Sequence, residues 1–418
     1  ATGDRPAVVR VGDAHSVFAN SRALALAGID ANTPDPPGGR IVRDANGVPT
    51  GHLLETAQRL LGPVLPKPTP ADRRRLLGVA TQAALSAGVT TVVNVGGTDD
   101  LALFEAARAD GTLGIRIAMA LWLTGQSATS ELPDGFAFTV ADADQFDAIR
   151  ADVHPDAWLK LDLVKIMLDG VIESHTAAML KPYSDDPTTS GHANYTPADL
   201  SRVITMMDAR GWHIMTHALG DRAVRIALDA YRDAAATNPV PSGGRRHKIE
   251  HIESIDPADI PRFGALGVTA SMQPSHAGGM NDPQMRGARW KYIGYERSGW
   301  GWPWQSIAQA GGRVAFGSDW PVAPLNIGRG MKVATGRIPH LPVPDQKLTV
   351  AQVIDAYTRD AAWSIFVEQD RGTLTPGKRA DIVVFHDDIF NQPVDGNHLP
   401  VRYTIVDGKI VYQNPATE

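Results

Sequence analysis

The chain of 418 residues contains no cysteine. Disulfide bonds, zinc–thiolate sites and a cysteine nucleophile are therefore all excluded. A metal ion in this protein must be held by histidine, aspartate, glutamate or a modified lysine.

An excess of positive charge and a long apolar run are absent as well. The chain carries 40 Lys and Arg against 46 Asp and Glu, a net charge of −6, with no basic cluster, which argues against nucleic-acid binding. No apolar run is long enough to span a bilayer, so we expect no membrane partner. The first residues show no signal-peptide pattern.

We expect a cytoplasmic protein with a small-molecule substrate. A signal peptide ahead of the given start and self-association into a homo-oligomer both stay open.

Short β-rich apolar runs alternate with amphipathic helical patterns from about residue 85 onward. Strands are predicted at 88–95, 114–123, 161–168, 211–217, 246–251, 267–273 and 312–319. Strands that alternate with helices of this length indicate βαβ units and a parallel sheet. Seven such strands are one short of an eight-stranded barrel. We predict an α/β fold, a TIM-like (β/α) barrel whose first strand is missing, plus a small β-sandwich module.

The barrel is predicted to span residues 1–365. Within it, residues 1–84 form an inserted segment of strand, helix and hairpin, and the hairpin turns at Ala45-Asn46-Gly47. Residues 349–365 are predicted to form one final helix. Residues 366–418 are predicted to supply the C-terminal strands of the β-sandwich module.

Two pairs of histidines share one spacing on predicted strands. His213 and His217 are four residues apart, as are His247 and His251, and the second member ends its strand. At about 3.3 Å per residue the members of a pair lie roughly 13 Å apart, too far to share one metal. Functional side chains of a parallel barrel lie at the C-terminal strand ends. His217 and His251 are therefore the predicted ligands, and His213 and His247 are predicted to be structural.

Asp319 ends the last predicted strand, and Lys165 lies near the end of another. Their side chains should converge with the two strand-end histidines, and imidazole and carboxylate groups suit zinc-type ions. An ammonium cannot coordinate a cation, so one interpretation of Lys165 is an ion pair with a carboxylate such as Asp169. A buried lysine loses its proton more readily, however, and a neutral amine can take up carbon dioxide. The resulting carbamate can bridge two metal ions.

Three further residues are predicted to contact substrate. His276 follows the segment SMQP, Trp320 follows Asp319, and His175 lies in the loop after the lysine strand. Loop histidines and a wall aromatic are the alternative interpretations. His15, in the segment DAHS, has no role that its local sequence reveals.

Motifs along nearly the whole chain carry a resemblance to a known family. They are DAHSVFANSRALALAGI (13–29), GGRIVRDANGVPTGHLLE (38–55), AGVTTV (87–92), VKIMLDGVIES (164–174), HALGDRAV (217–224), IEH (249–251), SMQP (271–274), GSDWPV (317–322) and LTPGKRADIVV (374–384). In this order they resemble the amidohydrolase superfamily, and more closely its family 3, YtcJ-like branch.

The resemblance implies a ligand set and a cofactor. By it, Lys165 is the carboxylated bridging ligand, His217 and His251 bind the second metal, and Asp319 is both ligand and general base. The implied cofactor is a divalent metal, with zinc as the expected ion, in one or two copies. The chain departs from the family in one respect: members carry a His-x-His pair on the first barrel strand, and no His-x-His occurs in this sequence. We therefore expect the given chain to start after barrel strand one.

The predicted function is metal-dependent hydrolysis of an amide or related C–N bond, with Asp319 as the general base. One alternative is a catalytically incomplete barrel that only binds a ligand or partner. The other is a metal-dependent esterase or lactonase that uses the same site. No motif identifies the substrate.

Overall fold

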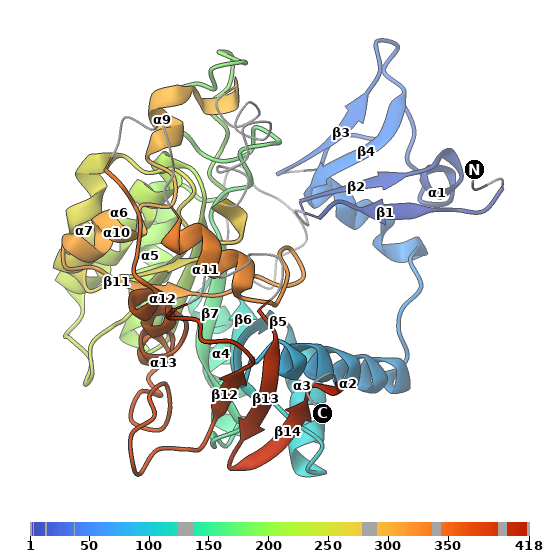
Figure 1. The fold of residues 1–418 in the computed structure, drawn as a ribbon. Coiled ribbons are helices and arrows are strands. Elements are labelled where there is room, and N and C mark those ends of the chain that lie inside the picture. The colour runs from blue at the N-terminus through green and yellow to red at the C-terminus, as the bar shows by residue number, and fades with distance from the viewer. Residues whose placement is uncertain are drawn as a thin grey trace.

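Three β-sheets organise the chain (Figure 1). They are a four-stranded N-terminal sheet, a seven-stranded parallel sheet and a three-stranded C-terminal sheet. The structure is a computed structural model, and it describes residues 2, 4–12, 15–36, 38–123, 138–277, 291–336, 344–391 and 399–415.

The seven-stranded sheet is the scaffold of the molecule. Its strands, in spatial order, are β11 (Arg313–Phe316), β10 (Thr269–Met272), β9 (Lys248–His251), β8 (His213–Ala218), β7 (Leu159–Met167), β6 (Arg116–Trp122) and β5 (Thr91–Gly96). Every neighbouring pair is parallel. All seven strands fall where the sequence predicts them, so the prediction of a parallel α/β sheet is confirmed. The sheet curls as a TIM-like half-barrel, and within the described residues its order ends at β5 and β11 (Figure 1).

Helices alternate with these strands along the chain, and several of them cover the outer face of the sheet. They are α2 (Pro70–Ser86), α3 (Thr98–Ala109), α4 (Val140–Asp152), α5 (Pro197–Ala209), α6 (Asp221–Thr237), α7 (Ile260–Leu266), α9 (Tyr295–Gly299), α10 (Trp304–Gln309), α11 (Gly328–Thr335), α12 (Val350–Tyr357) and α13 (Arg359–Ser364), with a short 3₁₀ helix at Pro257–Asp259. A second 3₁₀ helix, Thr56–Val64, packs on the N-terminal sheet. Capping interactions define the start of these helices, as α5 illustrates. The Thr196 hydroxyl at its N-cap accepts a hydrogen bond from the Asp199 N–H, and Pro197 occupies the first turn. The main core lies between these helices and the strands, where Val164, Ile214 and Leu228 are fully buried.

The inner face of the sheet holds a small cluster of apolar side chains. Ala118, Ala120, Leu163 and Met215 cluster there with Ile365, which follows α13. Successive side chains of a strand point to opposite faces, so the next inward positions toward the C-terminal ends are free for functional groups.

The N-terminal sheet contains β1 (Val8–Arg10), β2 (Ser16–Ala19), β3 (Gly39–Arg43) and β4 (Pro49–Glu55), in the order β1-β2-β4-β3, with helix α1 (Ser21–Leu26) against it. It has its own apolar core, in which Val17, Ile41 and Leu53 are buried. The pairing of β3 with β4 confirms the predicted hairpin at residues 45–47. In Figure 1 this sheet lies at the upper right, above α2.

The C-terminal sheet is antiparallel and contains β12 (Ile382–Phe385), β13 (Val401–Val406) and β14 (Lys409–Gln413). It packs on α2, where the Thr404 hydroxyl donates to the Leu85 carbonyl at 2.6 Å.

The prediction of one helix over residues 349–365 is wrong. The segment forms two helices, α12 and α13, because Thr358 between them has φ −123° and ψ −82°, outside the helical region. Its hydroxyl donates to the Ile354 carbonyl at 2.7 Å, which supports the end of α12.

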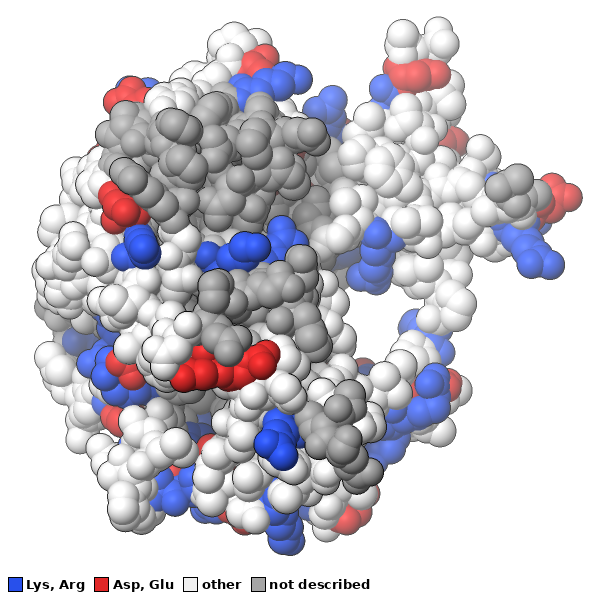
Figure 2. Space-filling model, in the orientation of Figure 1, with Lys and Arg blue, Asp and Glu red and all other residues white. Residues whose placement is uncertain are grey.

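Both signs of charge are scattered over the face of the molecule shown in Figure 2. Among the described residues, none of the helices combines the length and the apolar character that crossing a membrane requires.

A buried arginine joins the C-terminal sheet to the parallel sheet. Arg116, at the start of β6, is fully buried and binds both oxygens of Asp381, with Nε–Oδ2 at 2.6 Å and Nη2–Oδ1 at 2.9 Å. It also donates to the Ala157 carbonyl at 3.1 Å and stacks over the Trp158 ring at 4.6 Å. Its Nη2 also lies 3.2 Å from Asp407 Oδ1, so one buried guanidinium joins two carboxylates of the C-terminal module to β6.

Loss of this contact should destabilise the protein. Arg116→Ala leaves the Asp381 carboxylate buried without its partner, which should lower the free energy of unfolding by about 3–5 kcal/mol. Urea unfolding followed by circular dichroism measures the change. Arg75→Ala is the control, because that side chain is 66% exposed and should change stability by about 0.5 kcal/mol or less. Equal effects of the two substitutions would show that the Arg116 contact does not hold the modules together.

Candidate active site

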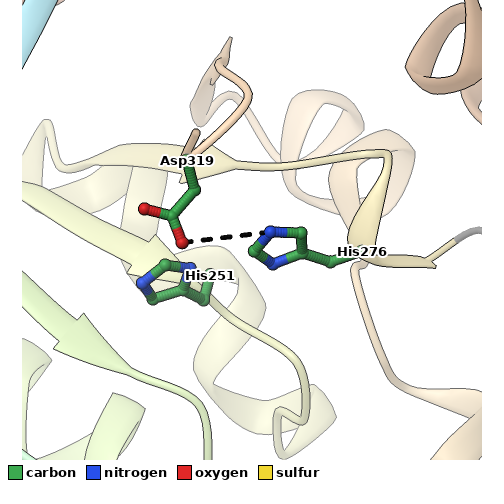
Figure 3. Close-up of side chains that lie close together, drawn as sticks. All are labelled: His251, His276 and Asp319. Carbon is green, nitrogen blue, oxygen red and sulfur yellow. Dashed lines mark ion pairs between the residues drawn. The ribbon is translucent and has the colours of Figure 1, made fainter. Parts of the chain in front are cut away.

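Two imidazoles and one carboxylate meet at the C-terminal ends of the last strands. His251 ends β9, His276 lies four residues beyond β10, and Asp319 lies three residues beyond β11. One ligand atom from each of the three lies within 4.8 Å of the others (Figure 3). The backbones of His251 and Asp319 have φ of 77° and 57°, a region that residues other than glycine rarely adopt and that is common at functional sites. This donor set suits a divalent ion of the zinc type.

Gln273 orients His251. It follows β10 directly, and its Oε1 lies 2.8 Å from His251 Nδ1. An amide oxygen only accepts, so Nδ1 carries the hydrogen and Nε2 has the lone pair available for a metal ion. Gln273 is in turn held by Glu250, whose Oε2 lies 3.4 Å from Gln273 Nε2.

His276 lies between two carboxylates. Its Nε2 is 3.9 Å from Asp319 Oδ2, and its Nδ1 is 3.7 Å from Glu253 Oε1. Burial lowers the pKa of His276, but Glu253 and Asp319 together bring it above the usual value. Burial also raises the pKa of the Asp319 carboxyl, against the opposing effects of Lys165 and His276. His276 and Asp319 thus form an ion pair at 3.9 Å.

His217 lies next to this donor set but is not one of the three residues whose ligand atoms lie within 4.8 Å of one another. Its ring lies 4.7 Å from the ring of His251, edge to face. Its Nε2 donates to the Gly170 carbonyl at 3.2 Å and lies 3.6 Å from Asp169 Oδ1. Burial holds the pKa of both His217 and His251 well below the usual value, so both imidazoles are neutral, as metal ligation requires.

Asp169 fixes the loops around His217. Its carboxylate accepts from the backbone N–H of Ala178 at 3.0 Å, of Leu219 at 3.0 Å and of Gly220 at 2.9 Å. Burial raises the pKa of this carboxyl to about 7, while the three N–H groups oppose the shift. The oxygens of Asp169 therefore serve the loops that follow β7 and β8, rather than a lysine ion pair.

Lys165 lies on β7, two residues before the end of the strand, and its side chain is buried, with the residue 6% exposed. Burial lowers the pKa of its ammonium group, and the negative charges of Glu250 and Asp319 oppose that shift. Glu250 is itself buried, and its Oε1 has no hydrogen-bond partner among the described residues. The lysine therefore faces the same carboxylates that surround the imidazoles.

The two other predicted substrate residues lie farther out. His175 Nε2 pairs with Asp185 at 2.9 Å, and the ring of His175 lies 4.5 Å from that of Tyr183 and 5.2 Å from that of Tyr292. Trp320 follows Asp319 and is 48% exposed.

The two histidines predicted to be structural lie at the opposite end of their strands. His213 stacks on Phe366 with ring centroids 4.0 Å apart. His247 Nε2 lies 3.0 Å from Asp208 Oδ1, and its Nδ1 accepts from the Ile214 N–H at 3.3 Å.

Sequence reasoning assigned no role to Gln273, His15 or Glu55. Gln273 lies in the segment SMQP, and its place directly after a strand was the available signal. His15 and Glu55 are 40 residues apart and pair side chain to side chain at 2.8 Å, beside His217. The pairing of β2 with β4 brings His15 and Glu55 together, and no local sequence pattern indicates that these two strands pair.

Comparison with known proteins shows the family to which the chain belongs. The model of a family described as the amidohydrolase family matches residues 1–412. The chain belongs to the amidohydrolase family. The resemblance drawn from the motifs is thereby confirmed, and membership of the family supports a hydrolase role.

Two similar proteins are the protein LONG AFTER FAR-RED 3 of Arabidopsis thaliana and the N-substituted formamide deformylase of Arthrobacter pascens. The first is 31% identical over 96% of this chain and 68% of its own length. The second is 28% identical over 96% of this chain and 72% of its own length. Among solved structures, an uncharacterized metal-dependent hydrolase from Pyrococcus horikoshii has a TM-score of 0.72 at 22% identity, over 95% of this chain and 74% of that one. This likeness confirms the TIM-like amidohydrolase fold.

Gln273 should support metal binding through His251. Gln273→Leu keeps a buried side chain of similar size but removes the acceptor for His251 Nδ1. We expect the affinity for Zn²⁺ to fall about 10–100-fold. Competition with a chromogenic chelator measures the affinity. Gln309→Leu, on the exposed end of α10, is the control. Unchanged affinity in Gln273→Leu would show that the contact with Gln273 does not support metal binding by His251.

Proposed function

We propose that this protein is a metal-dependent hydrolase that cleaves an amide or related C–N bond of a small molecule. The observation that carries the proposal is the meeting of His251, His276 and Asp319 at the strand ends, within 4.8 Å of one another. Family membership supports the hydrolase role. The bond type is supported by the printed name of the Arthrobacter pascens relative, an N-substituted formamide deformylase.

The residues at the site fit a divalent metal ion. The imidazoles of His217 and His251 are held neutral, and the Nε2 atom of His276 is buried with no hydrogen-bond partner in the described parts of the chain. We propose Lys165, His217, His251 and Asp319 as ligands for one or two ions, with zinc as the expected metal. His276 lies close enough to Asp319 to complete the set or to contact substrate. A divalent ion supplies Lewis acidity, which lowers the pKa of water and polarises a carbonyl group.

Asp319 is proposed as the general base. Burial raises the pKa of its carboxyl, and a base works best when its pKa approaches the working pH. The carboxylate can take a proton from the attacking water and pass it to the leaving nitrogen. His276, 3.9 Å from Asp319 Oδ2, favours the ionised form before the proton arrives.

Lys165 is proposed to carry a carbamate. Burial lowers the pKa of its ammonium group, which increases the share of the neutral amine that reacts with carbon dioxide. The carbamate oxygens would add two donors to the imidazoles and carboxylate. Electron density for an unmodified ammonium paired with Glu250 in the metal-loaded protein would contradict this assignment.

Two expectations accompany the proposal. The C-terminal strands β12, β13 and β14 are proposed to belong to a small β-sandwich module. The protein is proposed to act in the cytoplasm on a small molecule, without nucleic acid.

Substitution of Asp319 tests the proposal. Asp319→Asn keeps the shape and one oxygen donor but cannot accept a proton at neutral pH. We expect metal content and fold to stay near those of the parent, while kcat falls by at least about 10²–10⁴-fold. His217→Asn should instead lose metal first and activity in consequence.

Metal stoichiometry and kcat are measured side by side for both variants, on a panel of amides and matched esters. An Asp319→Asn protein within a few-fold of the parent rate would exclude Asp319 as the base. Esters cleaved in place of every amide would favour the esterase or lactonase alternative.

A further inference from the structure

Trp122 ends β6 on the inner face of the parallel sheet. Ala118 and Ala120 belong to the inner apolar cluster, whereas Met119 and Leu121 belong to the core between the sheet and its helices. Because successive side chains of a strand point to opposite faces, Trp122 follows Ala118 and Ala120 on the inner face. It lies at the C-terminal end of the strand, where a parallel barrel presents its functional side chains.

The register of the sheet brings Trp122 level with Lys165. The two residues are paired across β6 and β7, and the Leu123 N–H donates to the Lys165 carbonyl at 2.8 Å. Residues that are paired in neighbouring strands project to the same face of a sheet. The next inward position along β7 is Met167, which is paired with His217 on β8. The side chains of Trp122 and Met167 thus lie next to the positions of two proposed metal ligands.

The Trp122 side chain stays accessible at this position. The residues before it in β6 are all buried, yet the exposed fraction of Trp122 is 39%. Gly97 follows β5 directly and continues the register in which Gly96 pairs with Leu121, so it lies level with Trp122. Its backbone is extended, with φ −100° and ψ −176°, and a Cβ there would meet no described atom within 4 Å. Space therefore remains beside the indole on the β5 side.

The chemistry of this surface suits an apolar group. An indole offers a large, rigid apolar face, and the thioether of methionine adapts to irregular shapes. Small-molecule sites are lined mostly by apolar and aromatic side chains, with a few polar groups that fix the orientation of the ligand. The polar groups here are the imidazoles and the carboxylate at the other strand ends. Trp122 and the half-buried Met167 supply apolar surface on β6 and β7.

We propose that Trp122 forms the apolar wall of the substrate site, where it contacts an alkyl or aromatic substituent of the amide. This assignment rests on the proposed amide hydrolysis and deepens it by naming a substrate class: amides with a bulky apolar substituent, in preference to small amides. The competing role is structural, in which Trp122 only covers the strand ends next to Lys165.

The test uses three amides with the metal-loaded full-length protein. N-(cyclohexylmethyl)acetamide carries a ring on the nitrogen, N-methyl-cyclohexylacetamide carries it on the acyl side, and N-methylacetamide has no ring. Trp122→Ala should lower kcat/KM for at least one ring-bearing amide about 10–100-fold, mainly through KM, and leave N-methylacetamide within about threefold of the parent value. Trp122→Phe should keep most of the activity, because an aromatic face remains for the substituent to pack on.

Two further variants and the metal content serve as controls. Trp122→Thr, with a side chain that suits a strand, is the second variant if Trp122→Ala does not fold. Phe390→Ala is the matched control, because Phe390 is an aromatic residue beyond β12 that is 62% exposed, and its loss should change none of the three values. Metal content measured on every sample should be unchanged, since an indole is not a metal ligand.

The outcomes separate the two proposals. Equal losses for all three amides, no loss for any of them, or hydrolysis of N-methylacetamide alone overturns the role of Trp122, while amide hydrolysis stands. If the parent cleaves none of the amides, the proposed hydrolysis fails, and titration calorimetry with the same amides tests Trp122 separately. Weaker binding of a ring-bearing amide by Trp122→Ala than by the parent then supports the contact. Equal binding by both proteins, or no binding by the parent, overturns it.

Discussion

The carboxylate of Asp169 holds together the part of the molecule where chemistry is expected. It lies just beyond β7, is 1% exposed, and binds three backbone N–H groups from two loops. The backbone carbonyl of the next residue, Gly170, accepts a hydrogen bond from His217 Nε2. Because Gly170 has no Cβ, the Glu55 side chain can approach it closely. One buried acceptor thus helps to position a strand-end imidazole and the loop whose Thr176 hydroxyl donates to Glu55 of the N-terminal sheet at 2.7 Å. Removal of such a group would leave several buried donors without partners, which is costly.

Much of the scaffold could be predicted from the sequence, because its signals are local. Alternating apolar runs and helical patterns gave all seven strands of the parallel sheet. The rule that parallel strands present their functional groups at the C-terminal ends was sufficient to select His217, His251 and Asp319 and to set His213 and His247 apart. The structure places the first three within one region and the last two at the opposite strand ends.

The remaining features depend on long-range packing, which no local pattern reveals. His15 and Glu55 meet because β2 pairs with β4, and the sequence around either residue gives no sign of the other. His276 joins the donor set from a loop position four residues past β10, so its identity as ligand or substrate contact depends on loop geometry. The break between α12 and α13 depends on the conformation of one residue, Thr358, within a continuous helical pattern.

The proposed hydrolysis requires that the strand-end imidazoles and carboxylate hold a divalent metal ion. Anomalous diffraction from crystals of the full-length protein with Zn²⁺, recorded on both sides of the zinc absorption edge, detects such an ion. We expect a zinc peak bound by His251 and Asp319, at about 2.0–2.2 Å from their ligand atoms. A peak bound by other residues only, or no peak in protein that remains folded, would contradict it.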